Sequence, residues 1–399
     1  MSSAISPHSG TSPQTMLAPA RKIRALHVIH SVCHGGIESA LLNWVRGFPE
    51  YSGVEPFVAC FSGDRGLDAA FLRAAEGYGV SEVHRIPWTR SKPFFQAAKA
   101  VAALVESLQI DVVHTHAYYG DILGALLKRY SRVKVVATAY VWETYELHRQ
   151  IMQVMDWVAL HFVDQVTAHC EETRRRTVKL GFREKDVPLL ITGFPVDVPL
   201  PAPERRRRLR KEAGIADDEI FLVNVARLSP EKAHDQLLQS FQIIHQRYPK
   251  TKLWISGVGY KETEDKLLAL RDSLGLRGAA EFVGHKPDLW PMLHAADIMT
   301  HSSHAEGVPI AGLYGMAAGL PVVISDVGGV YEVFHQNETG IRVPENDVEG
   351  FARTVIELIE DPAKRQRLGG AARDFVVNQY SIEVACKRVE SIYREVLAR

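Results

Sequence analysis

Residues 300–329 read THSSHAEGVPIAGLYGMAAGLPVVISDVGG, and this stretch carries the unit from which the fold is built. It begins at the end of an apolar run, continues through a short loop, and then predicts a helix over Val308–Ala318. Gly319 and Pro321 end that helix and lead into the next apolar run. A strand, a loop, a helix and a second strand in this order form the repeating unit of a doubly wound α/β sheet.

The same alternation of apolar runs and amphipathic stretches extends over most of the chain. Parallel strands that helices cover on both faces are continuous apolar runs in a sequence. The pattern therefore predicts an α/β protein with two Rossmann-like domains that face one another across a cleft. In the first half the runs are Ala25–His30, Pro56–Phe61, Asp111–His116, Lys134–Tyr140, Gln165–Cys170 and Leu189–Thr192, with helical periodicity at Ser39–Phe48 and Phe94–Leu108. In the second half they are Ile220–Ala226, Lys252–Ser256, Ala280–Val283, Ala295–His301, Pro321–Ser325 and Gly340–Val343.

The boundary between the two predicted domains lies in a proline-rich segment. Four prolines fall between Pro195 and Pro203, and the run Arg205–Arg208 follows, which is the composition of a hinge or linker. Apolar residues at helical spacing predict a closing helix over Ile382–Leu397. The expected parts are a flexible tail (1–22), a first Rossmann-like domain (23–195), a linker (196–215), a second Rossmann-like domain (216–380) and a C-terminal helix (381–399).

The composition is that of a globular protein, with 46% hydrophobic and 24% charged residues. Lys plus Arg number 47, as do Asp plus Glu, and this balance argues against general nucleic-acid binding, which needs a basic surface. Basic residues nevertheless gather in Arg174–Lys185 and Arg205–Arg208. These two runs are interpreted either as a solvated helix face and a charged linker, or as a contact with an anionic membrane surface or an anionic acceptor.

The four cysteines are scattered, without the spacing of a zinc site, and a reducing cytoplasm is the simplest setting for them. Apolar runs stay below the ~18 residues that a membrane span needs, so no span is expected. The first 22 residues are rich in Ser, Pro and Thr and lack the apolar segment of a signal peptide.

Glu306 is the first candidate for chemistry, because it lies in the loop that leads into the helix predicted from Val308. Such a loop offers free backbone N–H groups and the positive end of the helix dipole to phosphate or sugar hydroxyls. The carboxylate of Glu306 can accept hydrogen bonds from a sugar, or it can cap its own helix. Both interpretations remain open on the sequence.

Arg227 and Lys232 form a second constellation, in the loop and first helical turn after the run Ile220–Ala226. Two cations near a helix N-terminus oppose the helix dipole, and a bound anion would remove that conflict. A nucleoside diphosphate carries the needed charge and gains more when it departs in a transfer reaction. The alternative is a surface pair that Glu231 neutralises.

The N-terminal half offers two further candidates. Gly35 and Gly36 directly follow the first apolar run, where glycines allow close approach of a ligand to the backbone, although a plain turn would need them too. His114 and His116 end the run Asp111–His116 and share one strand face. His116 is therefore predicted to face the cleft, where a histidine can contact a hydroxyl or a developing charge, or to be structural.

Several familiar motifs are missing. Gly257 and Gly259 follow a predicted strand, but Glu262 stands where a dinucleotide fingerprint has its third glycine. The chain has no GxxxxGK[ST] phosphate loop, no GxSxG nucleophile elbow and no Asp-x-Asp pair. No metal site is therefore expected, and NAD binding is disfavoured.

Taken together, these segments resemble the retaining glycosyltransferases of family 4, which have the GT-B fold. The resemblance extends from about residue 23 to residue 398, and the combination of motifs in this order is highly specific. The segments that carry it are HGGIESALLNW, VVHTH, VARLSPEK, WISGVG, EFVGHKPDLWPMLHAADIMTHSSHAEGVP, GLPVVISDVGGVYEVF and NETGIRVP.

The resemblance implies a role for each candidate. Arg227 and Lys232 would hold the diphosphate and stabilise the leaving group, and His116 would lie beside the donor sugar. Glu306 would bind sugar hydroxyls. The remaining donor contacts would come from the first loop at Gly35 and Gly36, the backbone near His285 and Lys286, which would receive the base, and the amides of the segment Gly307, Val308, Pro309 and Ile310. The first domain would then be the acceptor side, and the second would bind the nucleotide sugar.

Two positions depart from the family pattern. Tyr314 stands where the family usually has a second Glu that binds the ribose hydroxyls, and a phenol cannot supply the charge-assisted contact of a carboxylate. Donor binding would be weaker by about 1–2 kcal/mol, or the ribose would be held otherwise. Tyr140 stands where a TxH motif usually places a histidine. Neither change affects Arg227, Lys232 or Glu306.

The expected function is retaining transfer of a sugar from a nucleoside-diphosphate sugar, a UDP- or GDP-sugar, to a saccharide or lipid-linked acceptor in surface polysaccharide or glycolipid synthesis. The nucleotide sugar is a substrate, and no cofactor is expected. A cytoplasmic protein in peripheral contact with the membrane, without nucleic acid, fits these expectations. The alternatives are a nucleotide-sugar-binding protein that has lost catalysis, as Tyr314 and Tyr140 suggest, a sugar-nucleotide epimerase with the same architecture, and a nicotinamide-dependent dehydrogenase.

Overall fold

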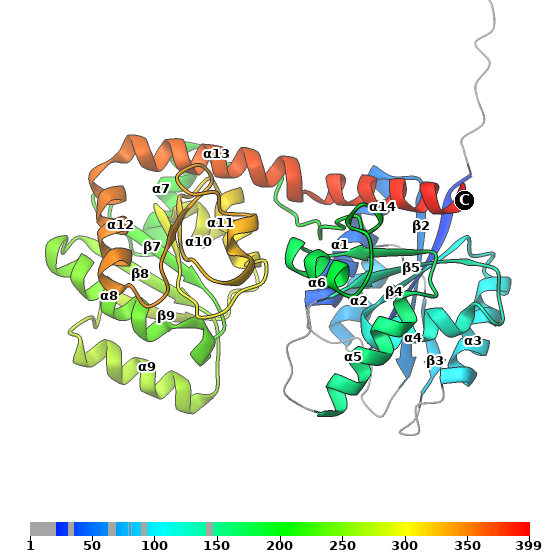
Figure 1. The fold of residues 1–399 in the computed structure, drawn as a ribbon. Coiled ribbons are helices and arrows are strands. Elements are labelled where there is room, and N and C mark those ends of the chain that lie inside the picture. Colours follow the sequence, from blue (N-terminus) through cyan, green and yellow to red (C-terminus); the bar gives the residue numbers. More distant parts are fainter. Residues whose placement is uncertain are drawn as a thin grey trace, which may run out of the picture.

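The computed structural model describes residues 21–30, 36–62, 69–78, 80, 82–88, 94–140 and 147–399. The tail expected over 1–22 lies almost entirely outside these residues. Within them, the chain forms two α/β domains, each a parallel sheet between layers of helices (Figure 1). The fold class predicted from the alternating runs is therefore confirmed.

The N-terminal domain contains a parallel sheet in the order β3-β2-β1-β4-β5-β6. Every residue of β4 is buried, as expected for a central strand covered by helices on both faces. The strands are β1 (Ile23–Ile29), β2 (Val54–Ser62), β3 (Val83–Pro87), β4 (Val112–His116), β5 (Lys134–Ala139) and β6 (Gln165–Ala168). The helices are α1 (Gly36–Tyr51), α2 (Ala69–Gly77), α3 (Phe94–Ser107), α4 (Ala117–Leu127), α5 (Leu147–Leu160), α6 (Glu171–Lys179) and the 3-10 helix η1 (Glu184–Asp186).

The C-terminal domain repeats this architecture in the order β12-β11-β10-β7-β8-β9. Its strands are β7 (Ile220–Val225), β8 (Thr251–Ser256), β9 (Ala280–Gly284), β10 (Ile298–His301), β11 (Val322–Ser325) and β12 (Ile341–Val343). Its helices are α7 (Pro203–Glu212), α8 (His234–Arg247), α9 (Lys261–Ser273), α10 (Trp290–Ala295), α11 (Ile310–Ala317), α12 (Val348–Glu360), α13 (Pro362–Tyr380) and the 3-10 helices η2 (Pro230–Lys232) and η3 (Gly328–Glu332).

The predicted strand Leu189–Thr192 is wrong. This segment makes only an isolated bridge between Leu189 and Ala168, because Pro188 before it has no N–H with which to extend a ladder. Conversely, the sequence analysis missed β3, which forms the edge of the first sheet. Only one residue of β3, Ile86, is fully buried, so this strand lacks the continuous apolar run that marks the others.

The arginine run is also placed differently from the prediction. Arg205–Arg208 lies within α7, whose first residue is Pro203, so it is part of a helix and not of an extended linker. Arg206 and the buried Arg210 both bind the carboxylate of Asp297, at 2.7 and 2.9 Å, and this anchors α7 to the C-terminal domain. Arg206 and Arg210 therefore contribute to the structure of that domain.

The last helix returns the chain to the first domain. α13 runs along the C-terminal domain and continues into α14 (Ile382–Leu397), which packs on α1 of the N-terminal domain (Figure 1). α14 spans the residues over which the closing helix was predicted. Its Tyr393 is fully buried, and the Tyr393 hydroxyl lies 2.7 Å from Nδ1 of His114 on β4. The closing helix therefore contacts the sheet that carries His116.

Candidate active site

The carboxylate of Glu306 is held by a converging set of donors at the carboxyl end of β10. Its Oε1 accepts hydrogen bonds from Lys232 Nζ (2.7 Å), His301 Nε2 (2.6 Å) and Ser303 Oγ (2.7 Å). None of the other residues that the structure describes donates to Oε2. One oxygen thus fixes the side chain, and the other is available to an incoming hydroxyl.

The environment keeps Glu306 ionised. Burial alone would raise the pKa of this carboxyl, but the hydrogen bond from His301 and the attraction of His301 and Lys232 outweigh it and lower the pKa to about 2. The Glu306 side chain is only 7% exposed and that of Lys232 16%, so the ion pair lies beneath the surface. A permanently charged, pre-oriented carboxylate is suited to binding sugar hydroxyls.

Topology brings Lys232 to Glu306, although 74 positions separate them in the sequence. β7 and β10 are neighbours in the sheet, so the loops at their carboxyl ends meet. The loops are also joined directly, because Ser302 Oγ donates to the Lys232 carbonyl (3.0 Å) and the His304 N–H donates to the Glu231 carbonyl (2.8 Å). An ammonium has three N–H donors, so Lys232 can bond Glu306 and still contact a phosphate.

Arg227 lies apart from this ion pair. Its side chain is 77% exposed and its NH2 group lies 3.2 Å from Glu231 Oε1. The surface pair with Glu231 that the sequence left open therefore forms for Arg227, whereas Lys232 pairs with Glu306. Arg227 remains free to turn toward a ligand because so much of its guanidinium is in solvent.

The helix after Glu306 presents an uncapped N-terminus. α11 begins at Ile310, two residues later than predicted, and its N-cap is Pro309, which has no side-chain oxygen to satisfy the first N–H groups. Gly307 and Val308 therefore belong to the loop before the helix. Gly328 holds this loop close: its φ is +52°, and a Cβ there would lie 1.9 Å from the Glu306 carbonyl oxygen.

The other residues of the C-terminal domain predicted to contact the donor are Tyr314, His285 and Lys286. Tyr314 on α11 is half-buried between Trp290 and Phe194, with ring centroids at 5.6 and 6.4 Å, and burial raises its pKa. His285 is exposed and Lys286 half-buried, and both directly follow β9. Among the described residues, neither of these two forms a hydrogen bond or an ion pair with Glu306.

On the N-terminal side the structure places His116 deeper than predicted. Gly35 lies outside the described residues, and Gly36 begins α1. His116 ends β4 but is only 1% exposed, because Tyr140 covers it with its hydroxyl 3.4 Å from Nδ1. His116 was predicted to face the cleft or to be structural, and in the structure its side chain is buried within the sheet.

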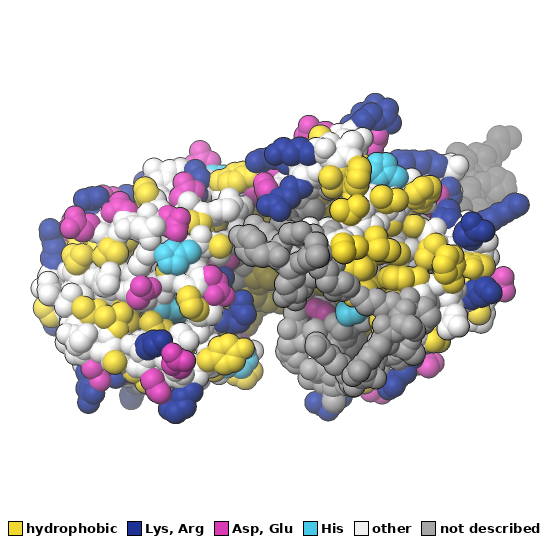
Figure 2. Space-filling model, turned by 60° about the horizontal axis from the view of Figure 1, so that its bottom comes forward, with side chains coloured by type: hydrophobic (Ala, Val, Ile, Leu, Met, Phe, Trp, Pro, Cys, Tyr) yellow, Lys and Arg dark blue, Asp and Glu magenta, His cyan; other side chains and the backbone are white. Residues whose placement is uncertain are grey.

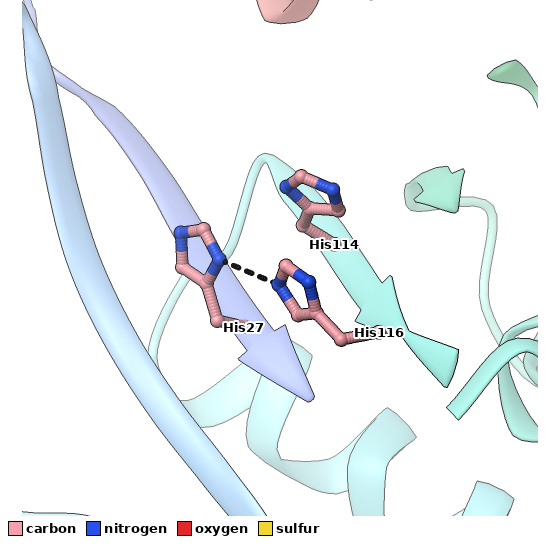
Figure 3. Close-up of side chains that lie close together, drawn as sticks. All are labelled: His27, His114 and His116. Carbon is pink, nitrogen blue, oxygen red and sulfur yellow. Dashed lines mark hydrogen bonds between the residues drawn. The ribbon is translucent and has the colours of Figure 1, made fainter. Parts of the chain in front are cut away.

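Three buried histidines, His27 on β1 and His114 and His116 on β4, lie close together (Figure 3). One ring nitrogen of each lies within 4.8 Å of the others, which is close enough for a shared metal ion. The rings of His114 and His116 stack face to face (4.4 Å, 30°), and in-plane lone pairs of stacked rings do not converge on one point. Both nitrogens of His114 already bond hydroxyls, Tyr393 at 2.7 Å and Thr138 at 2.7 Å. The arrangement fits a hydrogen-bonded core better than a ligand set.

The two domains touch next to the Glu306 loop. The Glu332 carboxylate, at the end of η3, accepts the backbone N–H groups of Glu171 and Glu172 at 2.7 and 3.0 Å and thereby caps α6. The Arg175 guanidinium lies 5.2 Å from the ring centre of Tyr331. The same 3-10 helix begins with Gly328, against Glu306, so the candidate site and the domain contact share one short segment. The surface is indented between the domains (Figure 2).

Sequence reasoning missed His301, Ser303 and His27. His301 ends a predicted strand five positions before Glu306, and a polar residue at the carboxyl end of a central strand was a usable signal. Ser303 carried no such signal. His27 stands within an apolar run on β1, and its partnership with His116 depends on the pairing of β1 with β4.

Comparison with known proteins identifies the family. The family model described as Glycosyltransferase Family 4 matches residues 34–197, and that of Glycosyl transferases group 1 matches residues 205–375. The chain belongs to this glycosyltransferase family. The resemblance drawn from the motifs is confirmed, and with it the assignment as a transferase enzyme.

Relatives of this glycosyltransferase differ in what they act on. A Mycobacterium tuberculosis glycogen synthase is 27% identical over 293 residues, covering 71% of this chain and 68% of that protein. A Corynebacterium glutamicum enzyme named GDP-mannose-dependent monoacylated α-(1-6)-phosphatidylinositol monomannoside mannosyltransferase is 27% identical over 379 residues, covering 90% and 94%. The structure of Anabaena Alr3699/HepE in complex with UDP matches with a TM-score of 0.80 at 18% identity, covering 94% of this chain and 100% of that one, and this likeness concerns the fold.

Proposed function

We propose that this glycosyltransferase moves a sugar, with retention of anomeric configuration, from a nucleoside-diphosphate sugar to a saccharide or lipid-linked acceptor. The observation that carries the proposal is the Glu306 carboxylate, fixed through one oxygen by three donors and placed beside Lys232 and the uncapped start of α11. Glu306 would bind hydroxyls of the donor sugar, while Lys232 and the N-terminus of α11 would bind the diphosphate.

The proposed reaction uses only the two substrates and side chains of this protein. The bond between the anomeric carbon and the diphosphate oxygen breaks, and the acceptor oxygen bonds to that carbon on the same face. The acceptor proton passes to the departing phosphate. Lys232 and Arg227 would stabilise the negative charge that develops on the leaving group.

The donor is proposed to be a UDP- or GDP-sugar. HepE has been crystallised with UDP and with UDP-glucose, and the Corynebacterium relative is named as GDP-mannose-dependent. Calorimetric titration of the purified protein with UDP-, GDP- and ADP-sugars tests this. Tight binding of one UDP- or GDP-sugar, followed by acceptor-dependent transfer, is expected. Binding without transfer to any acceptor would favour the nucleotide-sugar-binding alternative, and epimerised donor without an acceptor would favour the epimerase.

Tyr314 is proposed to contact the ribose in place of the usual carboxylate. We expect Tyr314→Phe to weaken donor binding roughly five-fold, since it removes only the hydroxyl. Tyr314→Glu should strengthen donor binding by a similar factor, because a carboxylate forms stronger bonds to a pair of hydroxyls. Calorimetry on both variants measures this. Unchanged affinity in both would place the ribose elsewhere.

The acceptor is proposed to be lipid-linked because an unusual apolar face lies beside Tyr140. Large apolar side chains of α5, and of the residues just after α5 and α6, are exposed there, and in Figure 2 apolar side chains gather on the N-terminal domain. Contiguous exposed apolar surface marks an interaction site. The exposed residues are Ile151, Val154, Met155, Trp157, Val158, Phe162 and Leu180.

A pocket opens within this face, between α5, α6 and Tyr140. Its volume is about 480 Å³, its lining is mainly apolar, and Arg176 and Lys179 stand at its border. This size suits a hydrocarbon or prenyl segment of an acceptor. In the part of the chain that the structure describes, no helix is both long and apolar enough to span a bilayer.

The basic cluster 174–185 contributes less to the proposed membrane contact than its sequence suggests. Arg174 lies 2.7 Å from Glu171, Arg176 lies 2.8 Å from Glu172, and Arg183 pairs with Asp186. Paired surface cations attract an anionic surface weakly. The solvated-face interpretation therefore suits most of this cluster, and the neighbouring apolar face becomes the main support for peripheral attachment. A cytoplasmic location remains part of the proposal.

The membrane contact predicts a simple binding result. The double variant Val154→Ser with Phe162→Ser should co-sediment with phosphatidylglycerol-containing vesicles roughly ten-fold less than the unaltered protein at low salt, because both exposed side chains lose apolar area. Phe95→Ser is the matched control, since Phe95 is 58% exposed on α3 of the same domain. Equal sedimentation of all three proteins would contradict the proposed contact, and so would a failure of the unaltered protein to sediment with the vesicles.

A further inference from the structure

The hydrogen bond between His27 and His116 has a direction that the surrounding atoms determine. His27 Nδ1 on β1 lies 3.2 Å from His116 Nε2 on β4, and the two rings are nearly parallel, 15° apart (Figure 3). Both rings are buried, and burial lowers the pKa of His27 to about 3 and that of His116 well below its usual value. Both imidazoles are therefore neutral, and only one of the two facing nitrogens carries a proton.

The environment of Nε2, the other nitrogen of His27, decides which of the two facing nitrogens carries the proton. His27 Nε2 is buried and has no hydrogen-bond partner among the described residues. If His116 donated to His27, the proton of His27 would sit on Nε2 as a buried N–H without an acceptor. If His27 donates through Nδ1, its Nε2 carries no proton and has only an unused lone pair. Buried N–H groups without a partner are rarer and costlier than unused acceptors, so His27 donates.

The direction of this hydrogen bond determines whether the Tyr140 hydroxyl donates to His116 or accepts from it. Because His116 accepts at Nε2, its own proton lies on Nδ1, which is 3.4 Å from the Tyr140 hydroxyl. Tyr140 then accepts from His116, and its O–H proton must point elsewhere. Tyr140 is only partly buried, and its hydroxyl has no second hydrogen-bond partner among the described residues, so its O–H proton is available to a ligand. Burial also raises the pKa of Tyr140, so the group remains a protonated donor.

We propose that His27 is a positioning residue that fixes His116 as the Nδ1–H tautomer, so that Tyr140 donates its hydroxyl proton to an oxygen of the bound carbohydrate substrate. The role of Tyr140 rests on the proposed transferase function. His27 touches no substrate and acts through His116.

The neighbouring His114 supplies an internal comparison. Tyr393 is fully buried, and its hydroxyl has His114 Nδ1 as its hydrogen-bond partner, so it donates to that nitrogen. His114 must then carry its proton on Nε2, where it donates to Thr138 Oγ1, which bonds Thr167 Oγ1 in turn (2.8 Å). Two histidines on one strand, two positions apart, are thus inferred to be opposite tautomers.

Nuclear magnetic resonance of the full-length protein labelled with [15N]histidine tests the tautomers directly. Long-range 1H–15N correlations distinguish a neutral ring protonated at Nδ1 from one protonated at Nε2, and single His→Gln variants assign the signals. We expect Nδ1–H for His27 and His116 and Nε2–H for His114. Finding Nε2–H on His116 would overturn the inference. The spectrum needs no donor or acceptor, so its outcome is independent of the proposed function.

Kinetics of His27 variants then test the consequence for the reaction. His27→Leu removes the donor, and we expect kcat/KM to fall roughly five- to ten-fold, the worth of one hydrogen bond. His27→Asn can place an amide N–H where Nδ1 stands and should stay within about two-fold of the unaltered protein. Phe48→Leu is the packing control, because Phe48 stacks on His27 (5.7 Å, 27°) without bonding it.

The two His27 variants separate positioning from simple packing. Full activity of folded His27→Leu, or an equal loss in His27→Asn and Phe48→Leu, would refute a positioning role. If even the unaltered protein transfers no sugar while the predicted tautomers are found, the proposed function fails and the tautomer assignment stands.

Discussion

Lys232→Ala is expected to lower kcat/KM for sugar transfer by roughly 10²–10³-fold, the usual effect of removing one donor that stabilises a developing oxyanion. The ammonium of Lys232 lies 2.7 Å from the Glu306 carboxylate. Its two remaining N–H donors are available to a departing diphosphate. Transfer kinetics with the donor found by calorimetry measure the effect. Lys232→Arg should recover only part of the activity, because a guanidinium cannot take the same position.

The variant should also be less stable, which the sequence alone would not suggest. The partners of this ion pair are 16% and 7% exposed, so removal of Lys232 leaves a buried carboxylate without its cation. We expect the free energy of unfolding to fall by about 3 kcal/mol at neutral pH. Lys250→Ala is the matched control, since Lys250 pairs with Asp218 on the same domain with both side chains exposed. Turnover by folded Lys232→Ala that equals the control would refute the diphosphate role.

The sequence analysis singled out Lys232 and Glu306 separately but did not predict that they form an ion pair. Each residue was singled out for its place in a loop before a helix, and both places were correct. Their contact depends on β7 and β10 being neighbours in the sheet, whereas 74 residues separate them along the chain. The strand order of a doubly wound sheet is not contained in any local pattern, so the sequence offered Lys232 only a bound anion or the neighbouring Glu231 as a partner.

Burial was the second property that local patterns could not supply. The position of His116 at the end of a strand was predicted correctly, but Tyr140, which covers it, comes from the neighbouring strand's end. The arginines of α7 were assigned to a linker because their composition is that of a solvated segment. In the fold, Asp297, about 90 residues later, compensates the charges of Arg206 and Arg210. In both cases a long-range partner overrides the local signal.

Glu306→Gln is expected to have the second large effect, again roughly a 10²–10³-fold loss of kcat/KM, with its main part in the chemical step if the carboxylate strengthens its bonds to the sugar in the transition state. The amide keeps the size of the side chain but loses the charge that attracts the three donors Lys232, His301 and Ser303. Glu345→Gln is the control, because Glu345 makes a similar bond to His304 (2.8 Å) at an exposed position. Comparable turnover in the two variants would exclude Glu306 from the reaction.

The charge of Glu306 also predicts a pH dependence that the variant should lack. The folded-state pKa of Glu306, about 2, lies below the ordinary value of 4.5, so its contribution to stability is complete above the ordinary value. That contribution is lost as the pH falls from about 4.5 through about 2, because protonation breaks the bonds from Lys232 and His301. Unfolding followed from pH 6 to pH 2 should show the unaltered protein losing more stability than Glu306→Gln. The same pKa keeps Glu306 ionised wherever the enzyme works, so an acid limb near neutral pH in the activity profile would have to come from another group.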